Sequence, residues 1–439
     1  MVTFLTGILI LGGDNAYTRF FFRCQSEEER QTLTATWFSF LALWSVVLIA
    51  VFLPFSGSIS EWMLDTDQYR AAMAIGFIAS PLLMMNLILS QALRNRFQAG
   101  AFTGLNVTTA VLTLSFSVFF VLAFDLGVAG ALLGAATAAL LMIPVRLWFI
   151  RDLLRPRFSL DFLKQLLLFG ISLVPMNVAF WLFSNADRLM LARLADLEEV
   201  GFYSIAASMA AVLMLLQTAV GQSWLPHGVK VYEEDREYAA IVFKRTMIFL
   251  LAGSGFVITG FAALAQEVLF ILVPPLYYRA FEAIPFLAAG FLFFTSAQVS
   301  SVGIMVRNKT IYIMLACWFV AAVNIGLNSL LIPIMGISGA AAATGSSYVL
   351  FAASYFVISR RLWRVDYPIS IIASLLTLPL IGIAVIAGIS FYGPTVVVNL
   401  ILKLIVLIFV GIGLVIIVGR VENKRPAQMI EALKGVIKK

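Results

Sequence analysis

The heptapeptide YRAAMAI at Tyr69–Ile75 returns as YRAFEAI at Tyr278–Ile284, 209 residues further along the chain. Three other phrases recur in the same order at nearly the same distance. They are GVAG at 127–130 with GISG at 336–339, Arg94-Asn95 with Arg307-Asn308, and the acidic run ending at Arg30 with the one ending at Arg236. One short match arises by chance, but four matches in order indicate two homologous halves.

The composition places these halves in a membrane. Of the 439 residues, 62% are hydrophobic and only 12% are charged, about half the charged share of a soluble domain. Apolar runs of about 20 residues, long enough to cross a bilayer as helices, recur from end to end. The chain is therefore predicted to be an all-α polytopic membrane protein. The predicted spans are 2–20, 33–55, 71–92, 102–123, 127–148, 162–184, 200–222, 244–265, 281–305, 310–332, 337–359, 369–391 and 396–419.

Lysine and arginine divide sharply between alternate connections of these spans. One side holds 25 of them, and the other side holds only Arg70, Arg188, Arg193 and Arg279. The basic side is predicted to be cytoplasmic, together with the C-terminus, by the positive-inside rule. The Tyr-Arg pairs that open both heptapeptides fall on the opposite side, where we interpret them as interfacial anchors.

Corresponding phrases of the two halves lie on the same side of the membrane, so the halves are predicted to be parallel repeats. The span at 162–184 has no counterpart in the first half, which indicates a first helix that the numbered chain lacks. The predicted organisation is an N-terminal lobe of five helices at 1–150, a C-terminal lobe of six helices at 158–364, two additional spans at 365–420 and a basic cytoplasmic tail at 421–439.

Several functions are disfavoured by composition. One histidine, His227, and two cysteines, Cys24 and Cys317, are too few for a zinc, haem or disulfide framework. No GxxxxGK[ST] phosphate-binding loop is present. We therefore expect no metal, no cofactor, no ATP hydrolysis by this chain and no nucleic-acid partner.

Short sequence motifs indicate a particular family of membrane proteins. GGDNAYTRFF at 12–21 resembles the second helix of the polysaccharide-flippase branch of the multidrug/oligosaccharidyl-lipid/polysaccharide exporter superfamily. Phrases that resemble the later helices of that branch follow in order: LLLFGISLVP (166–175), SNADRLMLARL (184–194), EEVGFYSIA (198–206), YRAFEAIPFL (278–287) and GISGAAAAT (336–344). The resemblance covers the chain apart from the absent first helix, so any basic site on that helix cannot be assigned.

The resemblance implies a flippase for polyprenyl-pyrophosphate-linked oligosaccharide, with two lobes enclosing a cavity that opens alternately to each leaflet. Its partners would be this substrate, membrane lipids and other proteins of polysaccharide assembly. A charged, hydroxyl-rich head group cannot cross hydrocarbon unaided, because its polar groups would lose their hydrogen bonds.

Two pairs of charges are candidates for transport. Asp14 and Arg19 lie in the first numbered span, where ionisable groups usually face an interior cavity. Alternatively, Arg19 snorkels to the head groups and Asp14 neutralises a neighbouring arginine. Asp187, which matches the family's seventh-helix aspartate, and Arg188 form either the outer mouth of the cavity, as an ion-pair gate or coupling-ion site, or a charge pair in water at a helix end.

Amides and one lysine complete the set of candidates. Asn177, Asn185, Gln217 and Gln222 either bind sugar hydroxyls or bond across helices. Lys403, in the last span, either snorkels to the outer head groups or contacts a lipid phosphate in a groove for the substrate's tail.

Two other functions stay open. A cation-coupled multidrug exporter of the same superfamily would need membrane-embedded carboxylates, of which the sequence suggests only Asp14. A membrane polysaccharide polymerase or ligase would need a large loop of catalytic residues on the outer side, and the outer connections are short.

Overall fold

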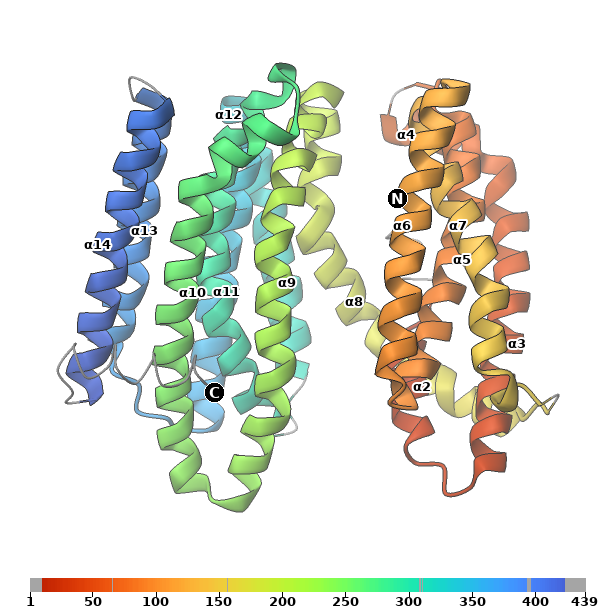
Figure 1. The fold of residues 1–439 in the computed structure, drawn as a ribbon. Helices are drawn as coiled ribbons and strands as arrows, with labels where there is room; N and C mark the ends of the chain where they lie inside the picture. Colours follow the sequence, from red (N-terminus) through yellow and green to blue (C-terminus); the bar gives the residue numbers. More distant parts are fainter. Residues whose placement is uncertain are drawn as a thin grey trace. The chain divides into compact units, whose positions relative to one another are not determined.

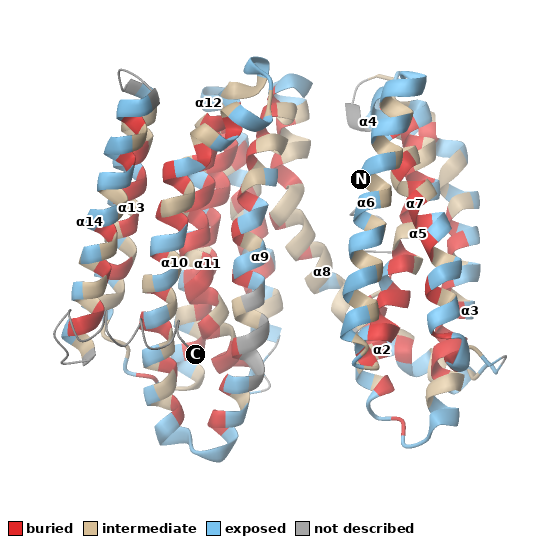
Figure 2. Cartoon of the chain, in the orientation of Figure 1, coloured by how far each residue is buried: buried red, intermediate tan, exposed pale blue. Residues whose placement is uncertain are grey.

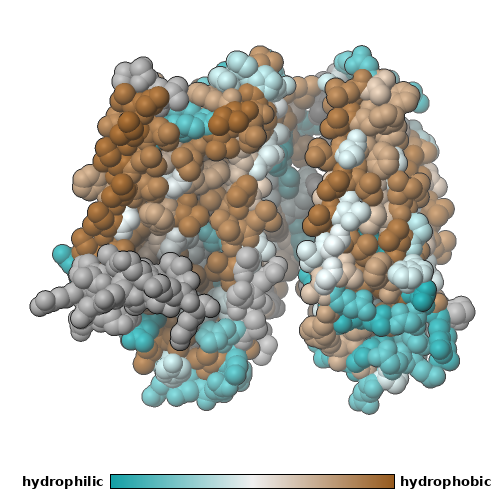
Figure 3. Space-filling view, viewed as in Figure 1, coloured by the Kyte–Doolittle hydropathy of each residue, from teal (hydrophilic) through white to brown (hydrophobic). Residues whose placement is uncertain are grey.

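The computed structural model describes residues 10–64, 66–155, 157–307, 309, 311–392 and 396–422. Every regular element in these residues is a helix (Figure 1). Apolar side chains cover the flanks of the long helices and hydrophilic ones gather at the helix ends, as Figure 3 shows for one face. The chain is a multi-pass membrane protein of the all-α class, as predicted.

Ten described helices are long and apolar enough to span a membrane, and the bent helix α8 makes an eleventh. Two differences separate this number from the thirteen predicted spans. Helix α12 (Ile311–Leu362) counts as one helix but contains two predicted spans. The two spans meet at Gly336, where the backbone is non-helical. Residues 2–9 of the predicted span 2–20 lie outside the described residues, and the rest contains only the nine-residue helix α2 (Gly13–Phe21).

The chain divides into two compact units, Met1–Trp181 and Leu182–Lys439, and the division falls inside α8 (Leu160–Leu194). This helix bends by 41° between its segments Leu160–Ile171 and Leu173–Leu194. Pro175 accounts for the bend, because it has no N–H to donate to the carbonyl of Ile171. The predicted lobe boundary between residues 150 and 158 therefore differs from the division into compact units, since the first segment of α8 packs in unit 1.

Unit 1 is built from hairpins of long helices. Its elements are α2 (Gly13–Phe21), α3 (Glu27–Phe52), α4 (Ser56–Leu64), α5 (Arg70–Asn95), α6 (Ala99–Phe124), α7 (Gly127–Phe149), two short 3-10 helices (Leu53–Phe55 and Arg151–Leu153) and the first part of α8. The core lies where α2, α3, α5 and α8 face one another (Figure 2). Trp37 and Leu166 are fully buried there, and the Tyr17 hydroxyl bonds to that of Thr34 at 3.0 Å.

The start of α2 corrects the predicted continuous helix over 2–20. Leu11 and Gly12 have left-handed backbones, with φ of 52° and 65°, so α2 begins only at Gly13. The turn lies directly against α8. A Cβ atom on Gly12 would come within 2.3 Å of the Gly170 carbonyl oxygen, and one on Gly170 within 2.3 Å of the Leu11 carbonyl oxygen. Only glycine permits this approach of two backbones.

Gly170→Ala is expected to destabilise unit 1 by about 1–3 kcal/mol, since the new methyl group would overpack the contact with the turn. Gly104→Ala in α6 is the matched control, because no atom lies within 4 Å of its Cβ position. Thermal unfolding of both purified variants in detergent measures the difference. Equal unfolding midpoints would contradict the close contact.

Unit 2 surrounds a buried central helix, α11 (Ile284–Met305). Its other elements are the second part of α8, α9 (Leu197–Glu234), α10 (Arg236–Leu272), a 3-10 helix (Pro275–Ala283), α12, α13 (Ile369–Tyr392) and α14 (Val396–Glu422). Helices α9, α10 and α12 pack around α11, and α13 and α14 pack on α10 at one edge of the unit (Figure 1).

Two of the repeated phrases meet at one end of unit 2. The Glu199 carboxylate accepts a hydrogen bond from the Ile337 backbone N–H at 3.0 Å and pairs with Arg279 at 2.9 Å. It thereby caps the helical run that begins after Gly336. Gly336 and its counterpart Gly127 both have left-handed backbones, with φ of 56° and 50°. The repeated glycines therefore mark equivalent turns between consecutive spans.

Candidate functional site

A chain of polar side chains joins α2 to α5 in unit 1. The Gln91 amide donates to the Thr18 hydroxyl at 2.5 Å and to the Asp14 backbone carbonyl at 3.3 Å. Thr18 in turn donates to the Asn95 side-chain oxygen at 3.2 Å. Residues 14 and 18 are one helical turn apart, so α2 presents both on the face that meets α5.

The two charges predicted on α2 differ in their surroundings. Asp14 is half-buried in the first turn, where an anionic side chain is favoured by the helix dipole. Arg19 is exposed in the last turn, and its guanidinium lies over the Phe169 ring of α8, 4.4 Å from the ring centroid. This cation–π contact holds the guanidinium beside α8 while leaving its N–H donors available to an anion.

Arg146 of α7 is a buried cation, although its place in the sequence predicted only that it is one of the basic residues on the cytoplasmic side. Its side chain is 1% exposed. It donates to the Ser90 hydroxyl, to the Thr109 hydroxyl at 2.7 Å and to the Asn106 side-chain oxygen at 3.1 Å. These neutral acceptors belong to α5 and α6, so the guanidinium ties three helices together.

In unit 2, Asp187 is a buried carboxylate that joins α8, α9 and α12. It is 2% exposed, and it accepts hydrogen bonds from the hydroxyls of Tyr203 and of Thr344, the latter at 3.3 Å. The Arg188 backbone N–H also donates to it at 2.8 Å. The aspartate is therefore not in water at a helix end, which was one of the two interpretations of its sequence position. Hydroxyl donors can stabilise its charge without neutralising it.

Arg188 lies on the next position of the same helix. Its guanidinium donates to the Asn185 side-chain oxygen at 3.1 Å and lies 5.8 Å from the Tyr203 ring centroid. Asn185, Asp187, Arg188 and Tyr203 thus form one polar cluster in unit 2.

The remaining amide candidates are Gln217, Asn177 and Gln222. The buried Gln217 of α9 accepts from the Thr295 hydroxyl of α11 at 2.9 Å, a bond across helices. Asn177 is half-buried in the part of α8 that belongs to unit 1. The side chain of Gln222 lies outside the described residues.

Lys403 requires a correction. Both interpretations of its sequence position need an exposed ammonium group, but the side chain is fully buried. It donates to Glu267 at 2.8 Å and to Gln266 at 2.7 Å, and so joins α14 to α10. Glu267 was missed because the hydrophobicity pattern placed it in a connection, whereas α10 continues to Leu272.

Lys403→Met is expected to destabilise unit 2 by about 3–5 kcal/mol, because it removes a fully buried cation and leaves the half-buried Glu267 carboxylate without its partner. The double variant Lys403→Met/Glu267→Gln removes both charges and should unfold at a higher temperature than either single variant. Thermal unfolding in detergent compares the three proteins. Additive losses in the double variant would show that the two residues do not act as a pair.

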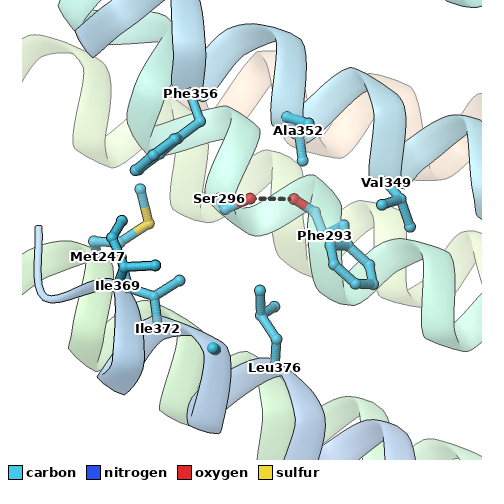
Figure 4. A pocket seen from close by; sticks show the side chains of 11 residues that line it. Met247, Phe293, Ser296, Val349, Ala352, Phe356, Ile369, Ile372 and Leu376 are labelled. Carbon is cyan, nitrogen blue, oxygen red and sulfur yellow. Dashed lines mark hydrogen bonds between the residues drawn. The ribbon is translucent and has the colours of Figure 1, made fainter.

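An apolar cavity of about 250 Å³ lies among α10, α11, α12 and α13 (Figure 4). Met247, Phe293, Phe356 and Leu376 contribute to its wall. Its one side-chain hydroxyl, on Ser296, already donates to the Phe293 carbonyl at 2.7 Å. The cavity is therefore suited to hydrocarbon rather than to a sugar or a phosphate. In the described part of the chain, no three metal-ligating side chains of His, Cys, Asp or Glu come together.

Comparison with known proteins agrees with this architecture. The sequence profile of a family described as polysaccharide biosynthesis protein matches residues 22–277, more than half of the chain. No curated protein matches.

Solved structures share the fold at low sequence identity. A lipid II flippase, MurJ, in an inward closed conformation has a TM-score of 0.72 and 15% identity over 96% of this chain and 91% of that chain. A MATE transporter in complex with MaL6 has a TM-score of 0.60 and 14% identity over 82% and 85%. A MOP superfamily transporter from Pyrococcus furiosus has a TM-score of 0.59 and 13% identity over 85% of both chains.

Proposed function

The chain belongs to the family of polysaccharide biosynthesis proteins, and we propose that it is a flippase that carries polyprenyl-pyrophosphate-linked oligosaccharide across the cytoplasmic membrane. The family match over residues 22–277 carries the proposal. The fold shared with a lipid II flippase over 96% of the chain is consistent with it. The protein would move its substrate without making or breaking a covalent bond.

The proposed mechanism follows from what the substrate cannot do alone. Its pyrophosphate and sugar hydroxyls need hydrogen-bonding partners at every depth of the bilayer, whereas its polyprenyl tail can remain in lipid. Alternating access between two lobes would present a polar surface first to one leaflet and then to the other. The basic connections and the C-terminus would lie on the cytoplasmic side.

We assign the substrate-contacting role in unit 1 to the α2 face. The exposed Arg19 guanidinium could bind a phosphate through two N–H groups, and its stacking on Phe169 would preorganise it. The half-buried carboxylate of Asp14 would accept hydrogen bonds from sugar hydroxyls. In unit 2, the buried carboxylate of Asp187 would bind and release the coupling cation, either a proton or a metal ion.

Deletion of the gene is expected to block surface polysaccharide and to accumulate its lipid-linked repeat unit on the cytoplasmic face. The side of the membrane on which the precursor accumulates is measured by its accessibility to a membrane-impermeant reagent in intact cells. The wild-type chain should restore outward exposure, and Arg19→Gln should not. If the precursor stayed accessible from outside in the deletion strain, the flippase proposal would be wrong.

Asp187→Asn is expected to lower the rate of outward exposure about tenfold, the size of a typical coupling between two sites. The substitution keeps the shape of the side chain and removes its charge. Asp366→Asn is the control, because Asp366 is an exposed acid of the same unit, paired with Arg364 at 3.4 Å. Equal rates for the two variants would exclude Asp187 from coupling.

A cation-coupled exporter of small molecules is the second candidate. The buried carboxylate of Asp187 and the half-buried carboxylate of Glu267 favour it, because membrane-embedded acids suit cation coupling. The deletion strain separates the two functions: an exporter defect would increase sensitivity to amphipathic cations and leave the lipid-linked precursor at its normal level. A polymerase or ligase is disfavoured, since the described connections contain no segment long enough for a catalytic domain.

A further inference from the structure

The apolar cavity of unit 2 is the inner part of a cleft between α12 and α13. Helix α13 packs against α10, α11 and α14, so α10 and α11 form the floor of the cleft and α12 and α13 form its walls (Figure 4). The exposed residues Val349, Ala353, Ile369 and Ala373 lie at its mouth. The cleft therefore opens on the side of the helices, at the depth of the membrane.

The position of the cleft along the helices is defined by its lining residues. Ile369 is the first residue of α13, and Leu376 lies about two turns further along, or about 10 Å. Phe356 lies near the end of α12, and its ring contacts that of Tyr367 at 5.4 Å. Tyr367 belongs to the connection between α12 and α13, so this contact lies at the helix ends, beside the cleft.

Basic side chains lie at this same end of the cleft. Lys244 precedes the lining residue Met247 by three positions on α10, and Arg360 follows the lining residue Phe356 by four positions on α12. Residues at these spacings share a helix face. Arg360 is exposed, and neither it nor Lys244 has a carboxylate partner among the described residues. Two cations are thus available one helical turn beyond the apolar wall.

We propose that this α12–α13 cleft binds one acyl chain of an anionic membrane phospholipid, whose phosphate is bound by Arg360 and Lys244. The cleft wall offers no free polar group, which excludes a water-filled or sugar-binding site. Hydrocarbon is the only abundant occupant at this depth of a membrane. The two cations select a negatively charged head group, as basic residues at membrane surfaces do. This site is separate from the polar surfaces assigned to transport.

Photolabelling of the full chain tests the proposal. The protein is reconstituted in phosphatidylcholine nanodiscs that contain a small fraction of phosphatidylglycerol with a diazirine on its acyl chain. After irradiation, the labelled peptides should come from 349–356 and 369–376. Unlabelled phosphatidylglycerol should compete with the probe, and extra phosphatidylcholine should not.

Two kinds of variant distinguish binding of the acyl chain from binding of the head group. Ala373→Phe fills the mouth of the cleft and should abolish labelling of both segments. Ala384→Phe is its control, because it makes the same change at an exposed position three turns further along α13. Lys244→Gln and Arg360→Gln should each weaken competition by phosphatidylglycerol about fivefold. These two residues are exposed or half-buried, so their replacement leaves the apolar core unchanged.

Three results would overturn the proposal. One is labelling that spreads evenly over lipid-facing helices and persists in Ala373→Phe. A second is equal competition by phosphatidylcholine and phosphatidylglycerol. A third is displacement of the probe by polyprenyl phosphate but not by phosphatidylglycerol, which would assign the cleft to the tail of a polyprenyl lipid.

Discussion

Backbone N–H and C=O groups in hydrocarbon must find partners within the protein, and the architecture of this chain depends on that constraint. Long helices satisfy it along most of their length. Where a helix is interrupted, other groups take over. At Gly336 the Glu199 carboxylate accepts from the first N–H group of the next helical run. At Leu11–Gly12 the interrupted backbone packs against Gly170 of α8. The irregular segments are therefore also points of close tertiary contact.

Buried charges obey the same constraint in three ways. Arg146 is bound by neutral oxygen atoms of two neighbouring helices. Asp187 is bound by hydroxyl and backbone donors. Lys403 is paired with a carboxylate. Only the last arrangement pairs opposite charges, because the hydrogen-bonding partners of Arg146 and Asp187 are neutral groups. Of these two, Asp187 can change its charge readily, because a carboxyl group exchanges a proton far more easily than a guanidinium does.

Much of the fold could be predicted because membrane helices carry their signal in local sequence. The helical class and nearly all of the span positions follow from hydrophobicity. The repeated glycines correctly marked equivalent turns, since both have left-handed backbones. The break at Leu11–Gly12 was missed, because a Gly-Gly pair in an apolar run is compatible with a continuous helix.

The polar sites were harder to predict, because burial depends on distant helices. Arg146 was assigned to a basic connection from its position alone. In the structure it is buried, and it donates hydrogen bonds to Ser90, Asn106 and Thr109 on neighbouring spans. Lys403 was misplaced for a related reason: its partner Glu267 was assigned to a connection. Asp187 could be selected from its local phrase, but its hydroxyl donors come from residues 16 and 157 positions away.

The partners of Arg146 and Lys403 have one further consequence, for biosynthesis. Each acceptor of Arg146 precedes it in the chain, and Gln266 and Glu267 precede Lys403 by 137 and 136 residues. Synthesis proceeds from the N-terminus, so the earlier helices leave the ribosome first. Each buried cation thus enters the membrane when the oxygen atoms that bind it are already there. The order of residues along the chain thereby lowers the cost of inserting α7 and α14, which carry these charges.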